Sequence, residues 1–342
     1  MTTSRTAPHR RYVVIGGGAV GGALAAQLVP AGREVVLVAR GEHGRTIAQR
    51  GLVVRRPGGV DVVHVPVASG PDDVDLREGD VLVLTVKTQD AEAALAQWAW
   101  RPVLDASGAP TGVAADLPLV TYQNGMLTED LALRRFSRVY GAVIGIAASY
   151  LVPGEIVSPS HPPAVGLVWL GRHAAPPDEL QEELVADLVG AGFAAWSVHD
   201  VRAHKAAKLL GNVGNGLDLF SGDDETRARA RVLLREEAVR VMEAAGVPLP
   251  PGGELDRGDV AFQVLPVEGH APGHLSTWQS FARGTSSEVD YLNGEVVLLA
   301  RRHGVEAPLN AALQRLLGPP GVAGELPDLS LDTLLAADRL LV

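Results

Sequence analysis

The fold of this chain is decided near its amino terminus by one stretch, Tyr12-Val13-Val14-Ile15-Gly16-Gly17-Gly18-Ala19-Val20-Gly21-Gly22. An apolar run opens directly onto Gly16-x-Gly18-x-x-Gly21 and an alanine-rich segment follows, which predicts a strand, a tight turn and a helix. In such a turn the first glycine permits the bend, the second lets a pyrophosphate approach the backbone, and the third lets the helix pack against the strand. We interpret the stretch as a dinucleotide-binding loop, in which the cofactor contacts are Gly16, Gly18, Ala19, Val20 and Gly21. A glycine-rich turn that binds no ligand is the alternative.

The next apolar run indicates which dinucleotide is bound. Val35-Val36-Leu37-Val38-Ala39 is typical of a buried parallel strand, and it ends at Arg40. A site that prefers NAD usually has Asp or Glu about 20 residues past the glycines, where it bonds the ribose 2′-hydroxyl, whereas a guanidinium suits a 2′-phosphate. Arg40 therefore favours NADPH. Two readings stay open: Glu42 could face the ribose instead, and a terminal arginine is often only solvated.

Composition places the chain in a broad class. Its 342 residues suffice for two domains that each bury a core, and 46% of them are apolar. The formal net charge of −10 argues against a general affinity for nucleic acid or an anionic membrane surface. Cysteine is absent, which excludes disulfides, thiolate metal sites and cysteine nucleophiles. Because no apolar stretch reaches the roughly 20 residues of a spanning helix, we expect a soluble, cytoplasmic protein with residues 1–10 as a disordered tail.

The hydrophobic pattern predicts an α/β fold, with a Rossmann-type doubly wound sheet followed by an all-α carboxyl-terminal domain. Apolar runs alternate with helical stretches up to Val198, with a hairpin around Pro57-Gly58-Gly59 and a loop from Asp105 to Asp116. Long helical patterns then cover Glu225 to Ala245 and Asp290 to His303, and a glycine follows each of them. We expect an NADP-binding domain over residues 11–198 and a helical catalytic and substrate-binding domain over residues 199–342.

A polar stripe marks the first helix of the second domain. Lys205, Lys208, Asn212 and Asn215 lie at offsets of three, seven and ten residues, which places them on one helical face. Such a stripe is either a solvated outer face or the wall of a polar pocket. A solvated face usually carries Glu or Arg as well, and neither occurs between Lys205 and Leu217. We therefore favour the pocket.

Three further polar clusters fall at predicted strand ends or in turns, where doubly wound folds bind their ligands. Val86-Lys87-Thr88-Gln89 follows one buried strand, and Gln123-Asn124-Gly125 follows the next. The third cluster extends from Ser276 to Gly294 and contains Glu288. Here a plain structural reading has equal weight, because a serine can cap the helix and Glu288 can favour its first turn.

Taken together, these segments resemble the ketopantoate reductase family. They occur in that family's order and approximate spacing over residues 11–317. The resemblance implies NADPH-dependent reduction of 2-dehydropantoate (ketopantoate) to pantoate, a step of pantothenate biosynthesis. It implies that Lys208 is the general acid and Glu288 a second catalytic carboxylate. The remaining residues that it assigns are Lys87 and Asn124 near the cofactor and the reacting carbonyl, and Asn124, Asn212 and Ser276 as substrate contacts.

The chemistry of a 2-oxo acid explains these residue types. As hydride reaches the carbonyl carbon, negative charge grows on the carbonyl oxygen, where an ammonium can stabilise it and then donate a proton. Lys208 lies on a largely apolar helix, so desolvation would lower its pKa toward a useful range, although Glu288 would oppose that shift if it were close. Ser276 and neighbouring backbone N–H groups can receive the substrate carboxylate.

Two positions depart from the family pattern and leave the substrate open. Gly216 stands where the family often has an asparagine, and Asn215, a further expected substrate contact, lies one position earlier. Gly273 stands where the family commonly has another asparagine. A reductase of a different 2-oxo acid or related carbonyl compound is therefore one alternative. A non-catalytic NADP(H)-binding regulator is another, although a sensor would need neither Lys208 nor Glu288.

We expect no metal site. His270 and His274 have a suggestive spacing, but Pro272 and Gly273 lie between them and prevent a shared helical face. The expected partner is a small 2-oxo acid, and the family resemblance suggests a homodimer.

Overall fold

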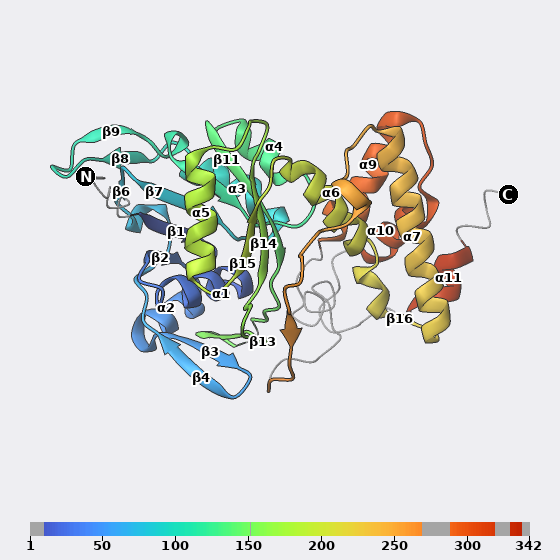
Figure 1. Cartoon of the computed structure of the whole chain (residues 1–342), viewed down its shortest axis with the longest axis horizontal. Coiled ribbons are helices and arrows are strands. Elements are labelled where there is room, and N and C mark those ends of the chain that lie inside the picture. Colours follow the sequence, from blue (N-terminus) through green and yellow to red (C-terminus); the bar gives the residue numbers. More distant parts are fainter. Residues whose placement is uncertain (1–9, 151, 269–287, 319–328, 337–342) are drawn as a thin grey trace. The chain divides into compact units, whose positions relative to one another are not determined.

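The computed structural model of the protein describes residues 10–150, 152–268, 288–318 and 329–336 (Figure 1). The described residues divide into two compact units. Unit 1 contains those of Met1–Gln123, Thr128–Val201 and Arg257–His270, and unit 2 those of Asn124–Leu127, Arg202–Asp256 and Ala271–Val342. The domain ranges 11–198 and 199–342 stay a prediction. In the two units, Asn124–Leu127 groups with the helical part, and the described residues of Arg257–His270 group with the sheet. The predicted tail lies outside the described residues, apart from Arg10.

Unit 1 is built on one large sheet. Among the described residues eight strands follow the order β15-β14-β11-β10-β7-β1-β2-β5, and all neighbours pair in parallel except β11 and β14. The strands are β1 (Arg11–Ile15), β2 (Glu34–Val38), β5 (Val67–Ala68), β7 (Asp80–Leu84), β10 (Pro118–Thr121), β11 (Arg138–Gly145), β14 (Leu167–Arg172) and β15 (Ala194–Ser197). The chain passes from β1 to β2 on one side and then returns to β7 on the other, so its winding reverses between β1 and β7. Folds of this kind bind ligands outside the carboxyl ends of the strands at such a switch point.

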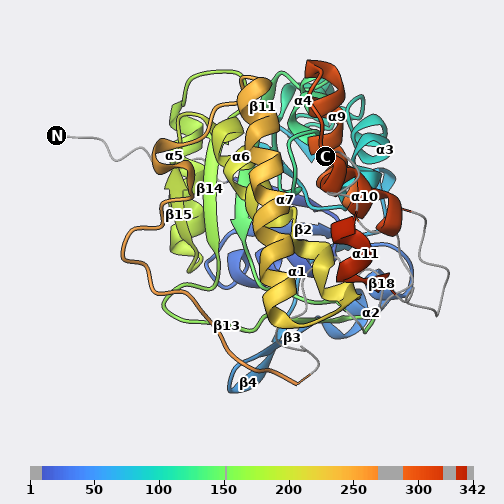
Figure 2. The same cartoon turned by 90° about the vertical axis from the view of Figure 1, so that its right-hand side faces the viewer.

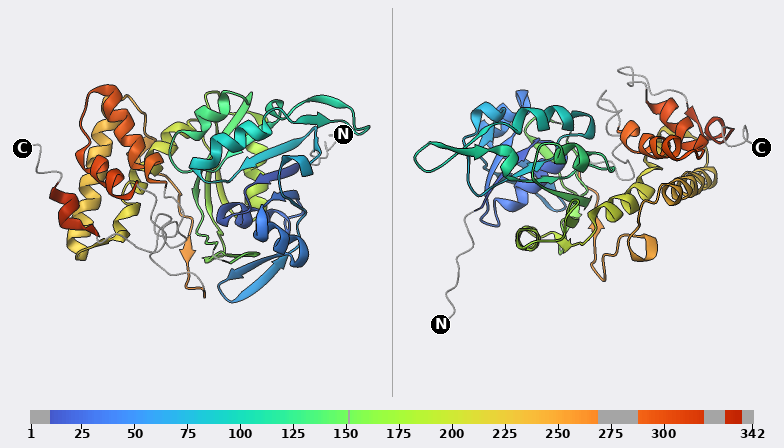
Figure 3. Two further views of the ribbon diagram at one scale, coloured as in Figure 1. Left: turned by 180° about the vertical axis from the view of Figure 1, so that it is seen from behind. Right: turned by 90° about the horizontal axis from the view of Figure 1, so that it is seen from above.

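Helices cover both faces of this sheet, because successive strand residues point to opposite sides. Tyr12 and Val14 pack with α1 (Ala19–Leu28) and α5 (Glu179–Gly190) in one apolar cluster. Val13 and Ile15 pack in a second cluster, with α3 (Thr88–Trp98) and α4 (Thr128–Leu133). Figure 1 shows α5 in front of the sheet, and the view from behind in Figure 3 shows the blue-green helix α3 on the opposite face. The predicted doubly wound architecture is confirmed.

Smaller strands flank the main sheet. The predicted hairpin is confirmed, since β3 (Leu52–Arg56) pairs antiparallel with β4 (Gly59–Val63) around Gly58, whose φ is +86°. The loop predicted from Asp105 to Asp116 is wrong in part, because β9 (Pro110–Val113) pairs with β8 (Pro102–Leu104) and a short 3-10 helix follows. Asp105 explains the difference: its Oδ1 accepts the N–H groups of Ser107 and Ala109 at 2.8 and 3.0 Å, and the resulting turn brings the flanking segments together.

Unit 2 is mainly helical, as predicted. Its helices are α6 (Val201–Asn212), of which Val201 belongs to unit 1, α7 (Asp224–Ala244), α9 (Asn293–His303), α10 (Pro308–Leu317) and α11 (Leu331–Ala336). Figure 2 shows α7 lengthwise with α9, α10 and α11 beside it. Leu234, Val296 and Leu313 are fully buried between these helices. Gly246 and Gly304 end α7 and α9 with φ angles of +63° and +66°, which confirms both predicted helix stops.

In the part of the chain that the structure describes, no helix is both long enough and apolar enough to cross a bilayer.

Candidate functional site

The glycine-rich loop after β1 is shaped by two crowded positions. Gly16 has a φ of +117°, and its N–H donates to the carbonyl of Val38 at 3.1 Å. A Cβ at Gly21 would lie 2.0 Å from the carbonyl oxygen of Gly16 and 2.5 Å from Oγ1 of Thr85. The roles predicted for Gly16 in the turn and for Gly21 in close packing are therefore confirmed.

Gly18 differs from these two glycines because it faces open space. Its φ is −69°, and a Cβ placed there would meet nothing within 4 Å among the described residues. Helix α1 begins directly afterwards, with Ala19 and Val20 partly exposed and with no side chain capping its amino terminus. The first N–H groups of a helix have no partner inside the helix, and its dipole favours a negative charge there. The open space and the uncapped N–H groups fit the pyrophosphate of a dinucleotide.

Two hydrogen-bonding side chains, one partly buried and one buried, join the ends of neighbouring strands at this edge. Thr85, just past β7, donates from Oγ1 to the carbonyl of Gly16 at 2.7 Å. Gln123, just past β10, donates from Nε2 to the carbonyls of Leu84 and Val86 at 3.0 and 2.8 Å. The sequence prediction did not include Thr85 and Gln123 as site residues, although each is a polar residue at the end of a buried apolar run. Together they hold the segments after β1, β7 and β10 at the switch point.

Lys87 and Arg40 lie at the same edge. Lys87 is partly buried and immediately precedes α3. Arg40 is exposed and immediately precedes α2 (Gly41–Arg50). Helix α2 starts close to the end of β2, because a Cβ at Gly44 would lie only 2.0 Å from the carbonyl oxygen of Ala39. The structure thus places Arg40 where the sequence expects a cofactor ribose, with Glu42 exposed in the first turn of the same helix.

Three predicted motif segments converge within unit 2. Asn212, the last residue of α6, donates from Nδ2 to Oδ1 of Asn124 at 3.3 Å. A Cβ at Gly125 would lie 2.6 Å from the carbonyl oxygen of Tyr291, which ends the 3-10 helix η5 (Val289–Tyr291). Asn293 then donates from Nδ2 to the carbonyl of Val213 at 2.9 Å. The segments that contain Asn124, Asn212 and Glu288 are therefore neighbours in the fold.

The polar stripe of α6 is not a solvated face. Lys205 and Asn212 are only 3% and 7% exposed, and Lys208 is partly buried. Burial lowers the pKa of the Lys208 ammonium, because a charged group is disfavoured when water is removed from it. No charged group among the described residues contributes to this shift. Lys208 thus has the lowered proton affinity that the sequence analysis expected of a general acid.

The expectation that Asn215 continues this stripe is wrong. Helix α6 ends at Asn212, and Asn215 instead begins a 3-10 helix, η3 (Asn215–Leu219). Gly214 has φ and ψ angles of −90° and 1°, which interrupt the α-helical path. The next turn then packs tightly, because a Cβ at Gly216 would lie 2.4 Å from Cδ1 of Leu317 in α10.

Glu288 is only 5% exposed, and its carbonyl accepts the N–H of Tyr291 at 2.9 Å at the start of η5. The residues of this cluster before Glu288, Ser276 among them, lie outside the described residues, as do His270 and His274. In the described ranges, no cluster of three or more His, Asp or Glu side chains has an arrangement suited to a metal ion.

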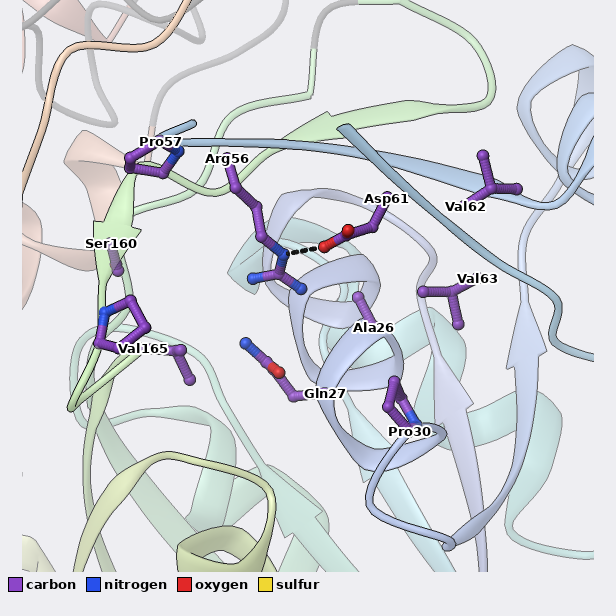
Figure 4. A pocket seen from close by; sticks show the side chains of 11 residues that line it. Ala26, Gln27, Pro30, Arg56, Pro57, Asp61, Val62, Val63, Ser160 and Val165 are labelled. Atoms are coloured by element: carbon purple, nitrogen blue, oxygen red, sulfur yellow. Dashed lines mark hydrogen bonds and ion pairs between the residues drawn. The ribbon is translucent and has the colours of Figure 1, made fainter. Parts of the chain in front are cut away.

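A cavity of about 550 Å³ lies at the opposite end of α1 from the glycine loop (Figure 4). Gln27 and Pro30 line it together with the β3–β4 hairpin, where Nε of Arg56 donates to Oδ2 of Asp61 at 2.7 Å. The cation of this cavity is therefore already paired. The carboxyl end of a helix dipole also disfavours phosphate, so we do not assign the dinucleotide to this cavity.

The fold and these positions define a class of protein: a Rossmann-type sheet with a glycine loop at its switch point, followed by a helical unit with a buried lysine stripe. Comparison with known families agrees with this class and narrows it. The model described as Ketopantoate reductase PanE/ApbA matches residues 12–174, and the model of its C-terminal part matches residues 205–320. The chain belongs to the ketopantoate reductase family.

Individual relatives cover nearly the whole chain. A protein named 2-dehydropantoate 2-reductase from Mesorhizobium japonicum is 30% identical over 324 residues, which cover 85% of this chain and 91% of that one. A protein of the same name from Pyrococcus horikoshii is 23% identical over 313 residues, with coverages of 90% and 96%.

Solved structures show the same fold. The crystal structure of a PanE/ApbA family ketopantoate reductase from Ralstonia eutropha has a TM-score of 0.71 at 26% identity, and the match covers 90% of this chain and 97% of that one. D-mandelate dehydrogenase, solved with NADH and anilino(oxo)acetate, has a TM-score of 0.72 at 19% identity, with coverages of 95% and 99%.

Proposed function

We propose that this protein reduces a 2-oxo acid to a 2-hydroxy acid with NADPH, and that the substrate is 2-dehydropantoate. The observation that carries the proposal is the convergence in unit 2: the Asn124 loop, the end of the lysine-bearing helix α6 and the segment after Glu288 are held together by side-chain and backbone contacts. The names of the relatives at 23% and 30% identity support the same reaction and substrate.

The residues of unit 1 fit the cofactor. The N–H groups at Gly18, Ala19 and Val20 would receive the pyrophosphate, and Gly16 and Gly21 would shape the loop beneath it. The exposed guanidinium of Arg40 would bind a 2′-phosphate through charge-assisted hydrogen bonds, which favours NADPH over NADH. Lys87 and Asn124, each at the end of a strand segment, would complete the cofactor contacts.

The proposed roles in catalysis follow from the chemistry of the carbonyl group. When bound, the nicotinamide cofactor would supply the hydride. Lys208 would stabilise the negative charge that grows on the carbonyl oxygen and then donate a proton from Nζ to that oxygen. Its lowered pKa makes this donation easier than from an exposed lysine. Solvent would afterwards return a proton to the amine.

The remaining residues would bind and orient the substrate. Asn124 and Asn212, whose side chains are joined at 3.3 Å, would offer neutral hydrogen-bonding groups, and Asn215 would provide a further contact from the next turn. Glu288 would orient Lys208 or accept a substrate hydroxyl. We also propose Ser276 as a partner of the substrate carboxylate.

A steady-state substrate panel tests the proposal. The purified protein would be assayed with NADPH and with NADH against 2-dehydropantoate, 2-oxoisovalerate, pyruvate and phenylglyoxylate. We expect the highest kcat/KM with NADPH and 2-dehydropantoate. The comparison with 2-oxoisovalerate is the sharpest, because it keeps the branched 2-oxo acid but lacks the hydroxymethyl group.

The other outcomes identify the alternatives. If 2-dehydropantoate is reduced no faster than the other acids, the substrate assignment is wrong and the protein reduces a different 2-oxo acid or related carbonyl compound. If NADPH binds tightly but no carbonyl compound oxidises it, the protein is a non-catalytic NADP(H)-binding regulator.

A further inference from the structure

His43 connects the glycine loop to two other segments of unit 1. It lies in the first turn of α2 and is only 8% exposed. Its Nε2 is 2.6 Å from the carbonyl oxygen of Gly17, the central glycine of the loop. Its Nδ1 accepts the backbone N–H of Gly154 at 2.8 Å. One imidazole therefore joins three parts of the chain that are far apart in the sequence.

These two partners determine the protonation state of the ring. The carbonyl of Gly17 can only accept, so Nε2 must carry a hydrogen. The N–H of Gly154 can only donate, so Nδ1 must have its lone pair free. His43 is therefore the neutral Nε2–H tautomer. An imidazolium would place a second hydrogen on Nδ1, directly against the N–H of Gly154, and that hydrogen bond would be lost.

The surroundings of the ring also favour the neutral form. The ring of Tyr150 packs against the imidazole, with ring centroids 4.3 Å apart and an interplanar angle of 49°. Glu155, in the same segment as Gly154, is paired with Arg55 at 2.8 Å. Removal from water lowers the pKa of His43, and the hydrogen bond to Gly17 only partly opposes this effect. No charged group among the described residues contributes to the shift.

The position of Gly154 leaves little room for movement. Its φ is +85°, and a Cβ there would lie 2.4 Å from Cγ2 of Thr46 in α2. On the other side of the ring, a Cβ at Gly17 would lie 2.6 Å from Cβ of Ala39. Because the backbone is closely packed on both sides, the imidazole is held in a fixed position between the carbonyl of Gly17 and the N–H of Gly154.

We propose that His43 is a positioning residue of the cofactor site, whose neutral imidazole fixes the carbonyl of Gly17 and holds the glycine loop in register with the start of α2. Gly18 follows Gly17, and Arg40 precedes the turn that contains His43. The ring thus sets the separation between the segment that would receive the pyrophosphate and the guanidinium that would receive the 2′-phosphate. The role rests on the proposed function, because it concerns the binding of a nicotinamide dinucleotide.

A pH dependence follows from this role. Only the neutral imidazole makes both bonds, because an imidazolium keeps the bond to Gly17 and loses the one from Gly154, so NADPH affinity is complete above the ordinary histidine pKa of about 6.5. The affinity declines as the pH falls through the lowered pKa of His43 in the folded protein, by up to about tenfold per pH unit. By linkage, NADPH binding must lower the pKa of His43 further.

Two substitutions separate the two hydrogen bonds. In His43→Gln the amide nitrogen occupies the place of Nε2 and can donate to Gly17 at every pH. In His43→Asn the amide oxygen occupies the place of Nδ1 and keeps the bond from Gly154 but not the bond to Gly17. His64→Gln is the matched control, because His64 is an exposed histidine of the same unit.

The experiment measures the dissociation constant of NADPH by fluorescence titration of the full chain between about pH 5.5 and 8. We expect His43→Gln, which lacks the bond from Gly154, to bind NADPH about 2- to 10-fold more weakly than the wild type at the upper end, and this ratio should shrink as the wild-type imidazole gains its proton. His43→Asn should bind about 2- to 10-fold more weakly than the wild type at the upper end. The 2′-phosphate of NADPH also gains a proton near a pH of about 6, but all variants share this change, so it cancels in the ratio. His64→Gln should follow the wild type throughout.

NADPH affinities of His43→Gln and His43→Asn that both lie within about twofold of the wild type at the upper end would overturn the proposal. A nitrogen-15 NMR titration of the wild type gives a second measurement that does not depend on the folding of any variant. It must show an Nε2–H tautomer in the cofactor-free protein and a lower imidazole pKa after NADPH is added; a doubly protonated ring at neutral pH, or an unchanged pKa, contradicts the role. If the wild type binds neither NADPH nor NADH, the proposed function itself is wrong and the cofactor role of His43 is lost with it, whatever tautomer the spectrum shows.

Discussion

Alanine substitutions at Gly18 and Gly21 should have opposite consequences, although the two glycines are only three residues apart. At Gly18 the backbone is extended and a methyl group would meet nothing within 4 Å. At Gly21 a methyl group would lie 2.0 Å from the carbonyl oxygen of Gly16 and 2.5 Å from Oγ1 of Thr85. The first substitution tests the space proposed for the pyrophosphate, and the second tests the packing beneath it.

The size of each effect can be worked from these contacts. Gly18→Ala costs no packing and restricts the unfolded chain, so the free energy of unfolding should stay equal or rise by about 0.4–1 kcal/mol. The added methyl group would displace the pyrophosphate from at least one charge-assisted backbone hydrogen bond, worth about 1.5–3 kcal/mol, which raises the NADPH dissociation constant by about 10- to 150-fold.

Gly21→Ala should act on stability instead. The methyl group overlaps a backbone oxygen that cannot move alone, and it also displaces the hydroxyl of Thr85 from its 2.7 Å bond to Gly16. Overpacking and the lost hydrogen bond together cost about 2–4 kcal/mol. For a unit of this size, the melting temperature should fall by about 4–16 °C.

Calorimetry and NADPH fluorescence titration on the same samples distinguish the two effects. Gly190→Ala is the control, because Gly190 is an exposed glycine at the end of α5 where a Cβ meets nothing within 4 Å. It should change neither NADPH affinity nor folding beyond a small gain in stability. NADPH binding by Gly18→Ala within twofold of the wild type would show that no pyrophosphate approaches this glycine. An unchanged melting temperature for Gly21→Ala would refute the packing argument.

Three further substitutions test other parts of the proposed site. Arg40→Ala should weaken NADPH by at least about tenfold and NADH by less than about twofold in the same fluorescence titration, and equal losses would remove the 2′-phosphate role. Lys208→Ala should lower kcat at least about 100-fold and leave NADPH affinity unchanged. In the wild type, kcat for reduction should fall as the pH rises through the lowered pKa of Lys208. In Lys208→Arg this decline should move to higher pH, because a guanidinium keeps its proton. Gly216→Asn should destabilise the protein by about 1–3 kcal/mol in urea unfolding, and a second change, Leu317→Ala, should make that loss smaller than the sum of the two separate effects.

Local patterns predicted the elements of the fold well because each depends on neighbouring residues. The run from Tyr12 to Gly22 forms a strand, turn and helix because its continuous apolar residues and its glycines act over a few positions. The stops at Gly246 and Gly304 likewise need only a residue that accepts a positive φ. The family resemblance then supplied roles that local chemistry alone could not assign, such as the general acid.

The sequence could not reveal features that depend on distant contacts. Asn215 leaves the face of α6 because the turn around Gly216 packs on Leu317, about 100 residues further along the chain. His43 was not recognised because its two partners lie 26 and 111 residues away. Its position three residues after Arg40, near Gly44, becomes informative only when the carbonyl of Gly17 is known to lie opposite the ring.

The close packing at Gly216 also changes how its departure from the family pattern should be interpreted. From sequence alone, the missing asparagine argues for a different substrate. In the structure, however, a side chain at this position would project onto Leu317 and Leu313, whose nearest atoms lie 2.4 and 3.3 Å from the added Cβ. A side chain directed into this apolar contact could not reach a ligand unless the turn changed its path. Glycine at position 216 therefore matches the packing of η3 on α10, which gives its departure from the family pattern a structural explanation beside the choice of substrate. Because Asn215 is partly exposed in the same turn, any substrate contact from this segment would have to come from Asn215.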